Sequence, residues 1–143
     1  MDMTKTCELL RCQQQTLGQL LSVLQQECDA LCEKNSEAIV SRAMEKQQLL
    51  DRVDELFLQY SRHIDPAAMP QDEQARQLWQ EVKTLTDECS QQNQVNGNMI
   101  ATGHQFARRA LSLLRGETVE GNACYSRDGK TDQVINSRTI AKA

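Results

Sequence analysis

Residues 3–31, MTKTCELLRCQQQTLGQLLSVLQQECDAL, carry the clearest periodic pattern in this chain. Apolar residues recur there at alternating steps of four and three, with one polar interruption at Gln14. The members of this first stripe are Met3, Cys7, Leu10, Leu17, Leu21, Leu24, Cys28 and Leu31. Such spacing aligns them along one narrow line of an α-helix, as in a coiled coil. The stretch is therefore predicted to be a long helix that packs against other helices.

A second stripe follows a short break at residues 34–36, where Ser36 is expected to cap the next helix. Its members are Ile39, Ala43, Lys46, Leu50, Val53, Phe57, Tyr60 and Ile64. The pattern stops at Asp65-Pro66, and residues 65–70 are expected to form a turn. Because the first connection is so short, the two helices should fold back as an antiparallel hairpin.

A third stripe starts after Pro70, which suits the first helical position, and stops before Gly116, the expected C-cap. Its members are Ala75, Leu78, Val82, Leu85, Cys89, Gln92, Asn96, Met99, Gly103, Phe106, Ala110 and Leu113. Asn96-Gly97 in its middle is a strong turn signal, but the periodicity continues across it. We predict one helix from near 70 to 115 with a weak centre, because an interior glycine costs about 1 kcal/mol relative to alanine. A true turn there would give four helices instead of three.

The composition agrees with an all-α protein. Aromatic residues make up 3% of the 143 residues, and long unbranched side chains such as glutamine lose little freedom in a helix. We predict an elongated, coiled-coil-like bundle, made of the antiparallel hairpin and the long third helix, as one domain over residues 1–116. Residues 117–143 are rich in Gly, Ser, Thr and Asn, and have too little apolar surface to order alone. They are predicted to be a flexible C-terminal tail.

Several function classes find no support in the sequence. It has no apolar run of 18 residues and no visible signal peptide, so neither a membrane span nor stable membrane insertion is expected. The net charge is −4 with basic residues dispersed, which argues against a nucleic-acid partner. His63 and His104 lack neighbouring ligands or nucleophiles, and no phosphate-binding loop is present. We expect no enzyme activity and no cofactor.

The six cysteines leave two interpretations open. They stand at positions 7, 12, 28, 32, 89 and 124, without a CxxC motif. Cys28 and Cys32 lie one helical turn apart, a spacing compatible with a pair of soft-metal ligands. The other interpretation is that Cys7, Cys28 and Cys89 are small core residues in a reducing cytosol. We expect no bound metal, and a thiol or metal protein that uses Cys28 and Cys32 remains a lesser hypothesis.

The far end of the third helix is the candidate interaction surface. The predicted helix is longer than the hairpin can cover, so its last part should expose apolar side chains. We call these residues the C-terminal stripe: Met99, Ile100, Phe106, Ala110, Leu111, Leu113 and Leu114. Exposed apolar stripes usually mark binding sites for partner proteins. The alternative is that the same residues close the bundle or a homodimer.

Three stretches together resemble one protein family. They are MEKQQLL at residues 44–50, NQVNGNMI at residues 93–100 and CYSRDGKT at residues 124–131. With the order and length of the helices, they make the chain similar to the FlgN family of flagellar type III export chaperones. The middle stretch and the Tyr-x-x-Asp-Gly tail are the most specific parts of this resemblance.

The resemblance implies a small cytoplasmic bacterial protein that binds unassembled hook-associated junction proteins. Such a chaperone prevents their premature association and delivers them to the cytoplasmic domain of the export gate. It also implies that the later third helix and the tail hold the cargo, and that Tyr125, with Asp128 and Gly129, docks at the gate. The alternative is a self-associating coiled-coil structural or regulatory protein without export cargo. A tight dimer would favour that alternative, whereas a monomer or weak homodimer would favour the chaperone.

Overall fold

The structure, a computed structural model, describes residues 2–116 and contains three α-helices in that range. They are α1 (Met3–Glu33), α2 (Ser36–Ser61) and α3 (Glu73–Leu114). Between residues 2 and 116 no regular element other than these helices occurs, and the predicted all-α class is confirmed. α3 continues through Asn96-Gly97, so the prediction of one unbroken third helix is correct.

The ends of the helices differ from the predicted ends by a few residues. Asn35, not Ser36, caps α2, since the Asn35 side chain accepts a hydrogen bond of 3.2 Å from the backbone N–H of Ala38. Pro70 lies before α3, which begins at Glu73. Asp72 caps it by accepting the N–H of Ala75 at 3.0 Å. Both corrections have the same cause, because a side-chain acceptor next to the first turn satisfies its free N–H groups.

The last turn of α1 and the end of α3 both use a left-handed residue. Lys34 has φ of 56°, and the N–H groups of Lys34 and Asn35 bond to the carbonyls of Leu31 and Ala30. This is a Schellman motif, which lets α2 start after only two residues. Gly116 has φ of 77° just beyond α3, as expected of a glycine C-cap.

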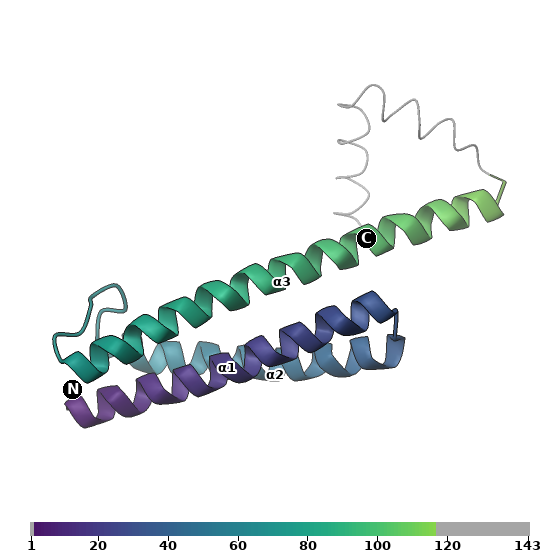
Figure 1. The fold of residues 1–143 in the computed structure, drawn as a ribbon. Coiled ribbons are helices and arrows are strands. Elements are labelled where there is room, and N and C mark those ends of the chain that lie inside the picture. Colours follow the sequence, from purple (N-terminus) through teal and green to yellow (C-terminus); the bar gives the residue numbers. More distant parts are fainter. Residues whose placement is uncertain (1, 117–143) are drawn as a thin grey trace, which may run out of the picture. The chain divides into compact units, whose positions relative to one another are not determined.

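α1 is buried on two sides by the other two helices. α2 returns antiparallel to α1, and the first part of α3 starts beside the N-terminal end of α1 (Figure 1). Along α1 four of the eight members of the predicted stripe are buried, namely Cys7, Leu10, Leu17 and Leu24, and a second buried line runs beside it. That second line consists of Thr6, Gln13, Leu20 and Glu27, spaced by seven residues. The fold is therefore a hairpin on which the first part of α3 packs as a third helix.

Hydrogen bonds fix α3 parallel to α1 in a regular register. The Cys89 thiol donates to the carbonyl of Leu17 at 3.4 Å, and the Asn96 amide donates to the carbonyl of Leu24 at 2.8 Å. Both pairs are 72 positions apart in the sequence and lie one heptad from each other. Side chains of α3 thus donate hydrogen bonds to backbone carbonyls of α1 at positions one heptad apart.

The chain divides into two units after Ile100, within α3. The unit of residues 1–100 holds the core described above. In the second unit the structure describes residues 101–116, where all side chains are exposed except the half-buried Ser112. The predicted tail, residues 117–143, lies outside the described residues.

Candidate functional site

A cluster of polar side chains around the buried Glu27 joins all three helices within residues 1–100. Glu27 of α1 is only 1% exposed, and its carboxylate pairs with the Lys46 ammonium of α2, the Nζ–Oε2 distance being 3.0 Å. The same ammonium donates to the side-chain oxygen of Asn93 on α3 at 3.4 Å. A buried carboxylate is tolerated only when it is paired and hydrogen-bonded, and Glu27 meets both conditions.

Asn96 completes this cluster from α3. It is fully buried, and its amide donates to Glu27 Oε1 and to the backbone carbonyl of Leu24, both at 2.8 Å. Its own side-chain oxygen accepts a hydrogen bond of 2.9 Å from Gln92. The asparagine that looks like a turn residue in the sequence is therefore a core residue whose polar groups are paired. We call Glu27, Lys46, Asn93 and Asn96 the Glu27 cluster, in which Lys46 is half-buried and Asn93 is exposed.

The sequence interpretation missed part of this cluster. Glu27 falls outside the first apolar stripe, so the spacing of apolar residues does not predict its burial. Gln13 was missed in the same way, although it is 2% exposed and donates to the carbonyl of Leu56 at 3.3 Å. The signal that could have found both is the heptad spacing with Thr6 and Leu20, since α1 contacts two neighbours and needs two buried lines.

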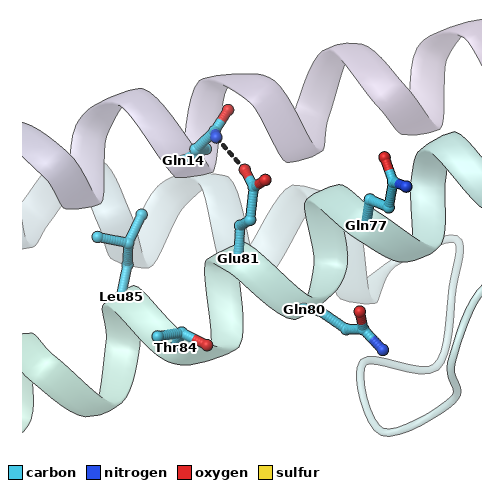
Figure 2. A pocket seen from close by; sticks show the side chains of 6 residues that line it. All are labelled: Gln14, Gln77, Gln80, Glu81, Thr84 and Leu85. Carbon is cyan, nitrogen blue, oxygen red and sulfur yellow. Dashed lines mark hydrogen bonds between the residues drawn. The ribbon is translucent and has the colours of Figure 1, made fainter.

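A shallow polar pocket lies between α1 and α3 (Figure 2). Gln14 of α1 donates to the carboxylate of Glu81 on α3, and the other lining residues come from α3. These are Gln77, Gln80, Thr84 and Leu85. Side-chain amides donate and accept hydrogen bonds, but they do not act as general acids, bases or nucleophiles near neutral pH. The one carboxylate in the lining, Glu81, already accepts from Gln14, so this pocket is suited to hydrogen bonding.

The C-terminal stripe changes character at Ile100. Met99 is half-buried, with its sulfur 3.9 Å from the Cys28 sulfur, and Ile100 is 41% exposed. The later large members are 49–84% exposed, Phe106 at 75% and Leu114 at 84%. Ala110 is exposed as well. The stripe thus begins at the half-buried Met99 of the first unit and continues as exposed apolar side chains.

Basic side chains accompany the exposed part of the stripe. Between Ala101 and Gly116 the sequence has Arg108, Arg109 and Arg115 and no acidic residue. This differs from the whole chain, whose net charge is −4. The described end of α3 is therefore both apolar and positively charged, a combination that favours partners with complementary negative charge.

The structure also bears on the predicted gate-docking residues and on the possibility of a metal site. Tyr125, Asp128 and Gly129, the predicted gate-docking residues, lie outside the described residues. Within residues 2–116 no group of three or more His, Cys, Asp or Glu side chains is arranged to hold a metal ion. The five cysteines in this range are free thiols.

Comparison with protein families gives a match to the FlgN protein model over residues 1–133. The chain belongs to the FlgN family. Comparison with curated proteins finds no match, and comparison with solved structures finds none either. Membership makes the chain a flagellar export chaperone in general terms, and the family is one of chaperones and not of enzymes.

The Glu27 cluster also brings together stretches of sequence that carry the FlgN resemblance. Two of the stretches that carry the FlgN resemblance, residues 44–50 and 93–100, contribute Lys46, Asn93 and Asn96 to it. These stretches are far apart in sequence and meet at Glu27 in the fold.

No helix within the described residues has both the length and the apolar character that a membrane-spanning segment needs.

Proposed function

We propose that this FlgN-family protein acts in the bacterial cytoplasm as a chaperone for unassembled hook-associated junction proteins. It prevents their premature association and delivers them to the cytoplasmic domain of the type III export gate. In this proposal the C-terminal stripe binds the cargo and Tyr125 docks at the gate. The single observation that best supports it is the exposure of the stripe beyond Ile100.

The spacing of the stripe supports a helical cargo segment. Phe106 and Leu113 are one heptad apart, with Ala110 between them, so the three lie along one line of α3. The large side chains can act as knobs, and the small alanine leaves room for a knob from the partner. The cargo is accordingly an amphipathic helix that pairs with α3 and is thereby kept from pairing with other subunits.

Charge supports a preference among such helices. Arg108, Arg109 and Arg115 lie on the same stretch as the stripe, without acidic neighbours in residues 101–116. A cargo helix with acidic flanks would associate faster than a neutral one, and the advantage would fall with rising salt. Salt-dependent association is therefore part of the proposal.

Introducing negative charges into the C-terminal stripe tests cargo binding. The variant Leu111→Asp/Leu114→Asp should lose capture of purified hook-associated proteins, while its helicity by circular dichroism stays unchanged. Leu58→Asp on α2 is a matched control, because Leu58 is 53% exposed and lies outside the stripe. Cargo capture by the double variant at the wild-type level would show that the binding face lies elsewhere.

Gate docking is tested separately at the tail. Tyr125→Ala should preserve capture of hook-associated proteins and weaken binding to the cytoplasmic domain of the export gate. The reason is that an aromatic side chain provides a large contact area at a low cost in rotamer entropy. Equal loss of both activities would contradict two separate sites.

The stripe also suits a second function, self-association. Phe106, Ala110 and Leu113, exposed at coiled-coil spacing, could pair with the same residues of a second copy, which would make the chain a structural or regulatory coiled-coil protein. Sedimentation of the purified protein separates the two functions. A dimer whose mass is independent of concentration would favour self-association, whereas a monomer or weak dimer would favour the chaperone.

A further inference from the structure

Two sulfur-bearing side chains are in contact where α3 packs against the end of α1, and a third stands one helical turn further along α1. Cys28 and Cys32 are one turn apart on α1. Met99 comes from α3, 71 positions away in sequence, and its sulfur lies 3.9 Å from the Cys28 sulfur. The sequence shows the two cysteines, but only the fold adds the thioether. All three residues belong to the first unit of the chain.

The environment of Cys28 links the three side chains. Cys28 and Cys32 stand at i and i+4 of α1, a spacing that places their side chains next to each other on one face of the helix. Cys32 is exposed while Cys28 and Met99 are half-buried, so the group has one open side toward solvent. An ion can enter from that side without unfolding the helices.

The donor set matches one class of ion. Thiolate and thioether sulfurs are soft ligands and select Cu(I) over harder ions such as Mg²⁺. A cation about 2.3 Å from each of three sulfurs in one plane holds the sulfurs roughly 4 Å apart. The observed Cys28–Met99 sulfur separation of 3.9 Å already has this value.

We propose that Cys28, Cys32 and Met99 form a binding site for one soft monovalent cation, Cu(I) being the best match. On binding, the two thiols release their protons to solvent, and the thioether donates a lone pair without losing a proton. The product has two thiolates, one neutral thioether and one Cu(I), with a net charge of −1. The ion would join α1 to α3 close to Asn96. The proposal is independent of the cargo-binding function.

Other chemistry at this site is disfavoured by its geometry. Side chains at i and i+4 of a helix have Cβ atoms about 5–6 Å apart, whereas a disulfide needs about 3.5–4.5 Å. A Cys28–Cys32 disulfide would therefore require α1 to unwind. A structural zinc site uses four Cys, His or carboxylate ligands, and no group of even three is present within residues 2–116.

The test uses the reduced full-length protein with [methyl-¹³C]methionine, titrated anaerobically with Cu(I) or with redox-stable Ag(I). The chain has five methionines, and one equivalent of the ion should shift the methyl signal of Met99 alone. Competition with the Cu(I) chelator bathocuproine disulfonate measures the affinity. Met99→Leu keeps the side-chain volume and should weaken binding by about tenfold or more, since one of three ligands is lost.

Two cysteine variants complete the experiment. Cys28→Ser should abolish the Met99 shift, even where other thiols still take up the ion. Cys12→Ser is the matched control, because Cys12 is an exposed cysteine on the same helix, and it should leave both the shift and the affinity unchanged. The proposal is overturned if the Met99 signal does not move at one equivalent, or if Met99→Leu competes for Cu(I) as well as the wild type.

Discussion

At the scale of single residues, the buried carboxylate of Glu27 depends on its neighbours to offset the cost of its burial. Its carboxylate is 1% exposed and has two partners, Lys46 and Asn96, from two different helices. A buried charge that loses its partner cannot regain the hydration it gave up on folding. A buried ion pair therefore adds little net stability when it is complete, yet breaking it is costly.

Replacing Lys46 with methionine should consequently destabilise the fold. Met keeps the apolar length of the lysine side chain but leaves Glu27 without its counter-ion. The expected loss is about 2–4 kcal/mol, somewhat below a fully buried case because the Lys46 side chain is 19% exposed. Urea unfolding at pH 7, followed by circular dichroism, gives the free energy of unfolding.

The control for Lys46→Met is the replacement of another basic residue by methionine, in an ion pair at the surface. Arg52 pairs with Glu55 at 2.9 Å on α2, and both side chains are more than half exposed. Arg52→Met should cost less than about 1 kcal/mol, since exposed ion pairs contribute little. Equal losses in the two variants would show that burial of Glu27 is not what makes Lys46 important.

Tyr60 predicts how stability depends on pH in the alkaline range. It is 2% exposed, its hydroxyl has no hydrogen-bond partner within residues 2–116, and burial raises its pKa. The unfolded state ionises Tyr60 above about pH 10 while the folded state stays neutral. The contribution of Tyr60 to the free energy of unfolding should therefore be constant below that pH and fall as the pH rises further.

The variant Tyr60→Phe isolates this contribution. It should be close to neutral at pH 7, because no hydrogen bond is lost, and should show a shallower loss of stability above pH 10. Burial also raises the pKa of the Cys89 thiol, so part of the alkaline loss will remain in the variant. Unfolding curves from pH 8 to 11 provide the comparison, and identical slopes for variant and wild type would contradict the assignment.

At the scale of elements, α3 carries a glycine that its packing does not require. Gly97 is exposed, and a Cβ atom added there meets no other atom within 4 Å. Gly97→Ala should therefore stabilise the helix by about 1 kcal/mol. Thermal unfolding followed by circular dichroism measures the gain. A loss of stability would mean that the backbone near Gly97 departs from a regular helix.

Gly18 on α1 provides the matched control, since a Cβ atom added there also meets nothing within 4 Å. Gly18→Ala should give a similar gain in stability. If both variants are more stable but only Gly97→Ala captures less cargo, then the flexibility of α3 at its centre serves binding. This pair separates helix propensity, which both sites share, from any role specific to α3.

Heptad spacing was sufficient to predict three helices, their order and the continuity of α3. It was not sufficient for α1, where the spacing of apolar residues shows one buried line and the structure has two. The second line contains Gln13 and Glu27, whose burial depends on Leu56 and Lys46 of another helix. A polar residue becomes a core residue only when a distant partner satisfies it, and one stretch of sequence does not contain that partner.

For the functional sites, too, sequence spacing predicts the local relations and not the contacts between distant residues. The spacing of Phe106, Ala110 and Leu113 predicts a shared face of α3, because that relation is local. The meeting of Cys28 with Met99 is not local, since it depends on the parallel register of α1 and α3. Helix ends are intermediate: Asn35 and Ser36 are both good caps, and local backbone geometry selects between them.

At the scale of the whole molecule, α3 belongs to two units with different sources of stability. Up to Ile100 it buries side chains against the hairpin, among them Val82, Cys89 and Asn96. From Ala101 to Leu114 its side chains are exposed, apart from the half-buried Ser112. A helical segment of this length without packing is marginal in water, because most helical stability in proteins comes from a buried face.

Amide hydrogen exchange should therefore change along α3. We expect amides from Val82 to Asn96 to be protected nearly to the level of global unfolding, and those from Gly103 to Leu114 to exchange at least roughly a hundredfold faster. Under the proposed function, a saturating hook-associated protein should slow exchange in the second segment, because pairing supplies the missing buried face. Amides in the middle of α2, around Val53, serve as the internal control and should not change. Uniform protection along α3 in the free protein would mean that the exposed segment is stabilised without a partner, and it would remove the physical reason for cargo to bind there.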